Sequence, residues 1–304
     1  MILNSIKSGI IRVLAAKRMI LVFYLASFCF GLVIILPLRA VLSDFVGDSM
    51  MGAKLGGPLD GDFLFDFFRN KSSAISAVQG LILVIPAFYW LFTLFLSGGA
   101  IGVFFSGEKY QPALFWSGCA KYFGRFIRLA LWGIPIFAIL FCLQFVASAV
   151  EKIGYGSDPY QNISYWFNWI KVGLRYVSFL LFWLVIDYAR IYTVINDERN
   201  MRKSIWQGIR FTFGHFLKTF SLSLLLFLAG VIILFAYNPL ADMLFMSSAA
   251  VVVLLFLLQQ LYMVFRMILR LTLYSSQIFL FNSMAGKTDS TAQISEHQLS
   301  AESL

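Results

Sequence analysis

An acidic and a basic residue lie one helical turn apart inside one of the most apolar segments, "LVIDYARIYTVINDERN". Asp187 and Arg190 are three positions apart, so a helix places them on one face. A charge within a bilayer is costly and marks a proton site, an ion site or an interhelical pair, for which Arg266 and Arg270 are candidate partners. The alternative is a local Asp187–Arg190 pair that holds a helix end near the membrane boundary.

A second group of acidic residues lies in "LDGDFLFDFFRN". The spacing of Asp60, Asp62 and Asp66 suggests calcium ligands, but the further oxygen ligands and the closing Glu of an EF-hand loop are missing. We expect instead a helix that begins at Asp60 or Asp62 and lies on the outer membrane surface through residues 63–68.

The remaining chemistry-bearing residues are few. The three cysteines and two histidines are too scattered for a metal site or a disulfide framework, and no phosphate-binding loop of the form G-x-x-x-x-G-K-[ST] occurs. A single Asp within the spans cannot form an aspartyl dyad, and neither His is placed to activate a serine. We therefore expect no enzyme, no cofactor, and no catalytic or metal-binding residues.

The composition indicates a polytopic membrane protein. Of the 304 residues, 60% are hydrophobic and only 13% are charged, which no soluble domain of this length tolerates. A span needs roughly 20 apolar residues. Segments of that length occur at residues 19–38, 81–105, 129–150, 172–195, 219–237 and 246–265, so we expect six transmembrane helices and read the first as a retained anchor.

The distribution of cations predicts the orientation. With six spans, 17 of the 24 Lys and Arg residues lie on the side of the two termini, so both termini are expected in the cytoplasm. The net charge of +9 is then mainly a topology signal, and binding to nucleic acid is not needed to explain it. The same basic surface is expected to attract anionic lipid headgroups.

Two segments of the sequence repeat each other. A shift of 90 residues aligns "WSGCAKYFGRFIR" (116–128) with "WQGIRFTFGHFLK" (206–218), and residues 91–128 share 10 identities with 181–218. A weaker copy is "SGIIR" (8–12), which resembles "SGCAK" (117–121). We predict two or three parallel repeats, each an interfacial helix followed by a helical hairpin, in units of about 1–90, 91–180 and 181–283.

On a helical projection, residues 116–128 and 206–218 each place aromatic residues on one side and cations opposite. This pattern is typical of helices that lie in the membrane surface. The alternative is that the segment simply extends the following span. The residues expected to contact lipid are Trp116, Lys121, Arg125, Arg128, Trp206, Arg210 and Lys218.

Two further features concern helix packing and the C-terminus. Gly98 and Gly102 form a small-xxx-small face suited to close helix packing. The apolar stretch from Met246 to Phe281 would measure about 54 Å as one helix, so it must tilt, break near "LYSS" or project inward. Residues 1–283 are expected to form one domain, and the polar tail 284–304 to be disordered.

At "LDGDFLFDFFRN", "IDYARIYTVINDERN" and "GIRFTFGHFLK" the chain resembles a loose group of uncharacterised bacterial six-span integral membrane proteins. The resemblance implies a location in the bacterial cytoplasmic membrane and the six-span topology. It implies no activity and no binding residue.

These observations favour a non-catalytic membrane protein that organises lipid or a membrane protein complex through amphipathic cytoplasmic helices. Its expected partners are membrane lipids, including anionic headgroups, and a membrane protein or a second copy of the chain. The alternative is a transporter of a small solute or lipid that uses Asp187 with Arg190, Arg266 or Arg270.

Overall fold

A computed structural model describes residues 2–47, 61–70, 72–108, 110–156, 160–243 and 249–302, with the side chains at 62, 64, 68, 72–78, 241–243, 249 and 285–302 left aside. Six of its helical segments are long and apolar enough to cross a membrane, and no strand occurs in these ranges. The predictions of an all-α fold and of six helices suited to cross a membrane are therefore confirmed.

The first half of the chain forms one helical hairpin with a short helix between its arms. Helix α1 (Ile2–Ala15) precedes the first span, α2 (Lys17–Val46). The short helix α4 (Gly61–Asn70) packs Phe63 and Phe67 against the end of α2, and α5 (Ser72–Ser106) returns to the packing site of α1 and the start of α2. The helix expected in "LDGDFLFDFFRN" is thus present, although Asp60 lies outside the described residues.

The second half forms two further hairpins. Helix α6 (Pro112–Phe141) continues after a bend at Cys142 into α7 (Leu143–Tyr155), and α8 (Gln161–Ile195) returns. The next helices are α9 (Met201–Gly214), α10 (Phe216–Met243) and α11 (Ala249–Glu302). α11 does not break at "LYSS", and it continues as a helix to Glu302, through the tail for which the sequence predicts disorder.

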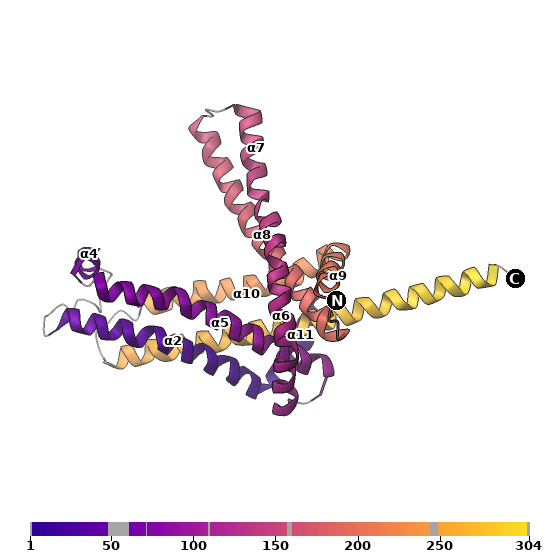
Figure 1. The fold of residues 1–304 in the computed structure, drawn as a ribbon, viewed down its shortest axis with the longest axis horizontal. Helices are drawn as coiled ribbons and strands as arrows, with labels where there is room; N and C mark the ends of the chain where they lie inside the picture. Colours follow the sequence, from indigo (N-terminus) through magenta and orange to yellow (C-terminus); the bar gives the residue numbers. More distant parts are fainter. Residues whose placement is uncertain are drawn as a thin grey trace.

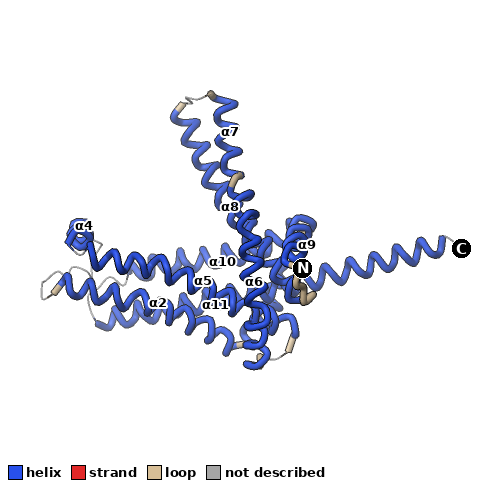
Figure 2. Tube along the Cα trace, in the orientation of Figure 1, coloured by secondary structure: helices blue, strands red, loops and turns tan. Residues whose placement is uncertain are grey.

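The main core lies where the termini of the spans converge, and we call this part the packed end (Figure 2). It joins α1, α9, the start of α2, the ends of α5 and α8, the first half of α6, and α11 from Met267 onward. The three most extensive helix contacts occur here: α5 with α6, α1 with α11, and α8 with α9. The most buried side chains therefore belong to this end of the fold.

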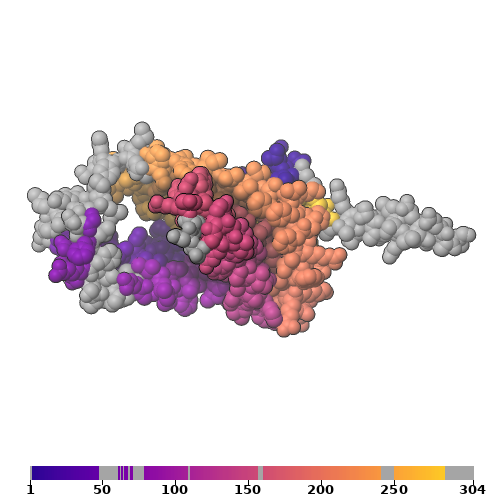
Figure 3. All heavy atoms as spheres, turned by 90° about the horizontal axis from the view of Figure 1, so that it is seen from above, coloured from indigo at the N-terminus to yellow at the C-terminus, as the bar shows by residue number. Residues whose placement is uncertain are grey.

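Away from the packed end the spans separate into two groups. α2, α5, α10 and α11 run together, whereas α7 and the first half of α8 form an arm that points in a different direction (Figure 1). Seen from above, the arm stands between the orange surface of α10 and the violet surface of α5 (Figure 3). Within the arm, Lys171 pairs with Glu151 at 2.6 Å, and Arg175 Nε donates to Gln144 Oε1 at 3.1 Å.

The two repeated segments differ in structure. Residues 206–218 are divided at His215, which separates α9 from α10, whereas 116–128 lie within the uninterrupted helix α6. The expectation of a separate interfacial helix at 116–128 is therefore wrong, and this segment extends the third span instead. Arg125, at the position equivalent to His215, is fixed by polar contacts to the loop between α8 and α9.

Candidate functional site

Asp187 and Arg190 lie in the buried part of α8 at the packed end. Arg190 Nη1 is 3.2 Å from Asp187 Oδ1, and the two side chains are 3% and 9% exposed, respectively. The guanidinium also lies over the rings of Trp183 and Phe126, 5.8 and 5.9 Å from their centroids. The i,i+3 pair expected from the sequence is thus formed, and aromatic rings cover its cation.

Helix α11 adds polar groups beside this pair. Arg270 is a second cation close to the Asp187 carboxylate, and its Nε donates to the Tyr274 hydroxyl at 3.2 Å. Gln277 is fully buried beside Asp187, and neither atom of its amide has a well-formed hydrogen bond among the described residues. The buried residues Asp187, Arg190 and Gln277 and the partly buried Arg270 therefore form a polar cluster with more positive than negative charge.

Arg266 is in a different environment. Its guanidinium lies 5.9 Å from the ring centroid of Tyr262, and it lines a cavity of about 280 Å³ between α2, α5 and α11 together with Pro86 and Tyr89. Tyr89 shares a hydrogen bond of 3.0 Å with Ser27 at the same cavity. Of the two candidate partners of Asp187, the structure thus brings Arg270 near it and gives Arg266 other neighbours.

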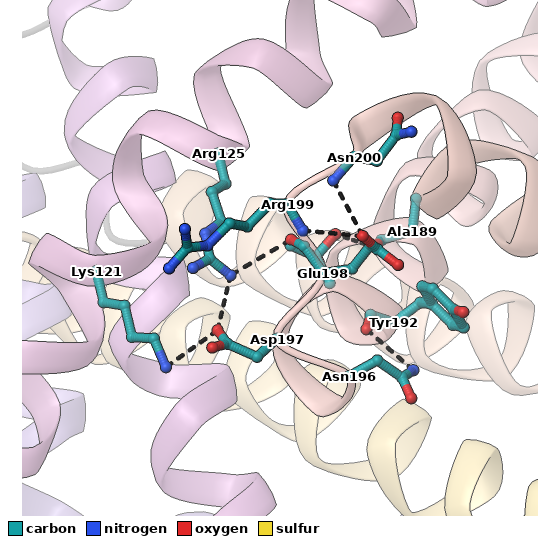
Figure 4. Close-up of polar contacts among 10 residues, drawn as sticks. Lys121, Arg125, Ala189, Tyr192, Asn196, Asp197, Glu198, Arg199 and Asn200 are labelled. Carbon is teal, nitrogen blue, oxygen red and sulfur yellow. Dashed lines mark hydrogen bonds and ion pairs between the residues drawn. The ribbon is translucent and has the colours of Figure 1, made fainter.

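A second ionic cluster joins α6 to the loop between α8 and α9 (Figure 4). Asp197 Oδ1 lies 3.0 Å from Lys121 Nζ and 2.7 Å from Arg125 Nη1. The same Nη1 donates to the carbonyl oxygen of Glu198 at 3.3 Å. Hydrogen bonds from Lys121 and Arg125 lower the pKa of Asp197, because they stabilise its charged form.

The loop also organises the start of α9. Glu198 accepts hydrogen bonds from the backbone N–H groups of Arg199 and Asn200 and pairs with Lys203 at 2.7 Å, which lowers the pKa of Glu198. The Asn200 side chain accepts from Arg202 N at 3.2 Å and caps α9. The Asn cap is a sequence signal for the start of this helix, but the contact with α6 has none, because it joins residues more than 70 positions apart.

The residues expected to contact lipid are distributed over two environments. Lys121 and Arg125 are engaged by Asp197, and Arg125 is buried. The others have exposed side chains, with Trp116 44% and Trp206 65% exposed; they are Trp116, Arg128, Trp206, Arg210 and Lys218. These five side chains therefore face outward, whereas Lys121 and Arg125 connect α6 to the loop between α8 and α9.

The close contact between α5 and α6 depends on small residues. A Cβ atom on Gly99 would lie 2.5 Å from the carbonyl oxygen of Phe115, and one on Gly98 would lie 3.1 Å from Tyr122 Cβ. Gly118 faces Gly99 from the opposite helix, whereas Gly102 has no atom within 4 Å of such a Cβ. The small-residue face thus consists of Gly98, Gly99 and Gly118, without Gly102.

The described residues contain no group of three His, Cys, Asp or Glu side chains that could hold a metal ion. No family model, no curated protein and no solved structure matches the chain. The geometry itself therefore has to indicate the function. It provides a polar cluster at Asp187, an ionic cluster at the loop between α8 and α9, and outward-facing aromatic and basic residues.

Proposed function

We propose that this chain is a non-catalytic protein of the bacterial cytoplasmic membrane that organises lipid or a membrane protein complex, with its packed end in the cytoplasm. The six apolar helices support a membrane location, and the concentration of cations at the packed end supports the orientation. The partners are anionic lipids and a membrane protein or a second copy of the chain.

One observation carries this proposal: a row of exposed apolar and basic residues along α9 and the start of α10. It consists of Arg202, Trp206, Arg210, Phe213 and Leu217, with Trp206 65% and Leu217 79% exposed. The opposite side of α9 is buried through Met201, Ile205 and Gly208. A row of this composition at a membrane boundary inserts its rings among headgroups and places its cations near phosphate.

Charge reversal at Arg210 in this row and at the neighbouring Lys218 tests the proposal. We expect Arg210→Glu with Lys218→Glu to reduce the anionic lipid or protein partner retained by the chain, because both cations are exposed and make no ion pair among the described residues. The measurement is native mass spectrometry of protein released gently from its own membranes. Arg69→Glu with Lys152→Glu is the matched control at the other end of the spans.

Equal retention of lipid and partner in both double variants would contradict the proposal. A loss restricted to Arg210→Glu with Lys218→Glu would support it, and the mass of the lost species would tell lipid from protein. A partner with the mass of the chain itself would identify a homo-oligomer.

We further propose that three related units build the fold. Gly9, Gly118 and Gly208 occupy equivalent positions in the repeated segments, and each lies against the returning helix of a hairpin: Gly9 on Ser276, Gly118 on Gly99, and Gly208 on Ala189. Gly99 and Ala189 are themselves 90 residues apart. Since α1 contacts α11, the last hairpin closes on the first, and the three units form a ring.

The buried cluster on α8 and α11 favours a transporter as the second candidate function. Gln277 interacts with Asp187, but among the described residues neither atom of its amide has a hydrogen bond of standard geometry, and a solute could supply one. On this hypothesis, Asp187→Asn abolishes the retention of a small solute or single lipid species while a protein partner is kept. An unchanged set of bound species in Asp187→Asn would remove the support for transport.

A further inference from the structure

A cavity of about 490 Å³ opens at the packed end between the α1–α2 junction and the end of α5. Three cations line it: Arg12, Lys17 and Arg18. Arg12 Nη1 donates to the carbonyl oxygen of Phe104 at 3.4 Å, and none of the three forms an ion pair within the described part of the chain. The other polar groups in the lining come from Glu108, which is exposed, and Tyr110.

The internal repeat gives this cavity a counterpart at the ionic cluster around Asp197. The alignment of "SGIIR" with "SGCAK" makes Arg12 equivalent to Lys121, and the shift of 90 residues makes Gly107 equivalent to Asp197. Backbone geometry agrees with this register, because Gly107 and Asp197 both have positive φ angles, of 68° and 47°. Asp197 has the only positive φ angle among the non-glycine residues that the structure describes.

The two equivalent places differ in the carboxylate and in one cation, because Gly107 replaces Asp197 and Ala16 replaces Arg125. At the second, the Asp197 carboxylate lies between Lys121 and Arg125. At the first, Gly107 has no side chain, and a Cβ added to it would meet no atom within 4 Å. Cations therefore surround an open space where the other unit has a carboxylate.

We propose that this cavity binds an anionic phosphate group from outside the chain, in the place that the Asp197 carboxylate takes in the neighbouring unit, and that the phosphate belongs to a membrane phospholipid. Lys and Arg side chains bind phosphate through charge-assisted hydrogen bonds. The inference deepens the proposed function by giving the lipid a defined site, and it rests on the proposed repeat for its register.

The surroundings of the cavity favour a lipid over a soluble anion. Leu14, Leu21 and Phe105 flank the lining residues in sequence and are 47%, 54% and 41% exposed, so acyl chains can cover apolar surface beside the headgroup. The phenol of Tyr110 is protonated at neutral pH, so its hydroxyl can donate a hydrogen bond to a phosphate oxygen. Basic pockets on the cytoplasmic side of spans are known to bind phospholipid headgroups.

A substitution that copies the neighbouring unit provides the sharpest test. Gly107→Asp places a carboxylate among the cations, and Asp tolerates a positive φ better than most residues, as Asp197 does. We expect the affinity for phosphatidylglycerol, titrated into nanodiscs or detergent and counted by native mass spectrometry, to fall on the order of tenfold. The matched control is Gly107→Asn, which has the same shape without the charge and is expected to retain the lipid.

A second pair of variants tells whether the lipid binds at a defined site or to the basic surface as a whole. Arg12→Gln with Arg18→Gln should lose the tightly bound phosphatidylglycerol, whereas Lys7→Gln with Arg199→Gln, which removes the same charge, should keep it. Equal binding by Gly107→Asp and Gly107→Asn, or equal loss in the two double variants, would overturn the site.

Inorganic phosphate distinguishes the two sources of the anion. Failure of millimolar phosphate to displace phosphatidylglycerol would support a lipid, whereas phosphate binding without lipid retention would overturn that assignment. This test can fail separately from the test of the proposed function. Gly107→Asp can lower lipid binding when the Arg210 and Lys218 variants do not change the retention of lipid or partner. The Arg210 and Lys218 variants can likewise reduce that retention when Gly107→Asp has no effect.

Discussion

The segments 116–128 and 206–218 share a sequence pattern and differ in path. The second is divided at His215, where φ is −126° and ψ is 36°, so α9 and α10 are separate helices. A similar division occurs at Ala16, between α1 and α2, with φ −98° and ψ 45°. In the proposed register Ala16, Arg125 and His215 are equivalent, and only at Arg125 does the helix continue.

This difference shows how one local pattern supports two architectures. The breaks at Ala16 and His215 change the chain direction before α2 and α10, which join the group of four spans (Figure 1). Since α6 does not break, it continues straight toward α7 and carries the arm away from that group. The contacts of Arg125 with Asp197 and Glu198 are the polar interactions that hold this stretch of α6 in place.

The largest expected effect concerns the contact that both segments share. Gly99→Ala and Gly208→Ala should destabilise the chain, by about 3 kcal/mol for Gly99→Ala, because the added Cβ would meet the backbone of the facing helix. The Cβ would lie 2.5 Å from a carbonyl oxygen at Gly99 and 2.9 Å from the Ala189 nitrogen at Gly208, so the first effect should be larger. The measurement is the midpoint of thermal unfolding in nanodiscs.

Gly102→Ala is the control for this pair, because a Cβ there meets nothing within 4 Å. It should stabilise α5 by up to about 1 kcal/mol, as alanine favours a helix over glycine. Similar midpoints for Gly99→Ala and Gly102→Ala would contradict the close approach of α5 and α6.

A smaller effect should follow from releasing α6 from the loop. Arg125→Ala removes the hydrogen bonds to Asp197 and Glu198 and should cost about 2 kcal/mol. We also expect the arm to take a wider range of positions. Spin labels at Leu83→Cys on α5 and Ile153→Cys on α7, in a chain lacking its native cysteines, would report this by electron spin resonance.

Arg128→Ala is the matched control, because Arg128 is exposed and, among the described residues, its Nε donates to Gly124 O of its own helix, at 3.2 Å. If the distance distribution between the two labels widened equally in Arg125→Ala and Arg128→Ala, the contact with Asp197 would not determine the position of the arm.

The smallest expected effect is a dependence on acidic pH. The folded pKa of Asp197 is lowered by Lys121 and Arg125, so its contribution is present above the ordinary pKa of Asp and is lost as pH falls through the lowered value. Since the side chain is 53% exposed, solvent screens most of this energy. Below about pH 4, the unfolding midpoint of the parent should approach that of Asp197→Asn. A constant difference down to pH 2 would be inconsistent with this linkage.

The sequence predicted the spans well because a bilayer imposes a length of apolar residues that is visible without tertiary structure. The i,i+3 spacing likewise predicted the Asp187–Arg190 pair. The same pattern matching failed at residues 116–128, where α6 continues without a break and Arg125 contacts Asp197, a residue 72 positions further along the chain. The repeated sequence thus predicts the helix contacts of Gly118 and Gly208, but it does not predict the different directions of the chain after Arg125 and His215.

The buried cluster could be predicted only in part. Arg270 and Arg266 are one turn apart on α11, and the sequence treats them as equal partners for Asp187. Helix packing turns Arg270 toward Asp187 and leaves Arg266 at the cavity beside Tyr89. The sequence also did not indicate the proposed role of Gly107, because that role follows only from the contacts of Asp197 at the equivalent position.

The divergence of the arm has a consequence for the membrane itself. Two groups of spans that separate from a common end cannot both run along the bilayer normal, so at least one must tilt. The outer ends then occupy a larger cross-section than the packed end, and the protein has the shape of a wedge. Lipids around it must fill unequal areas in the two leaflets, so in the orientation proposed above each copy would bend the membrane toward the cytoplasmic side.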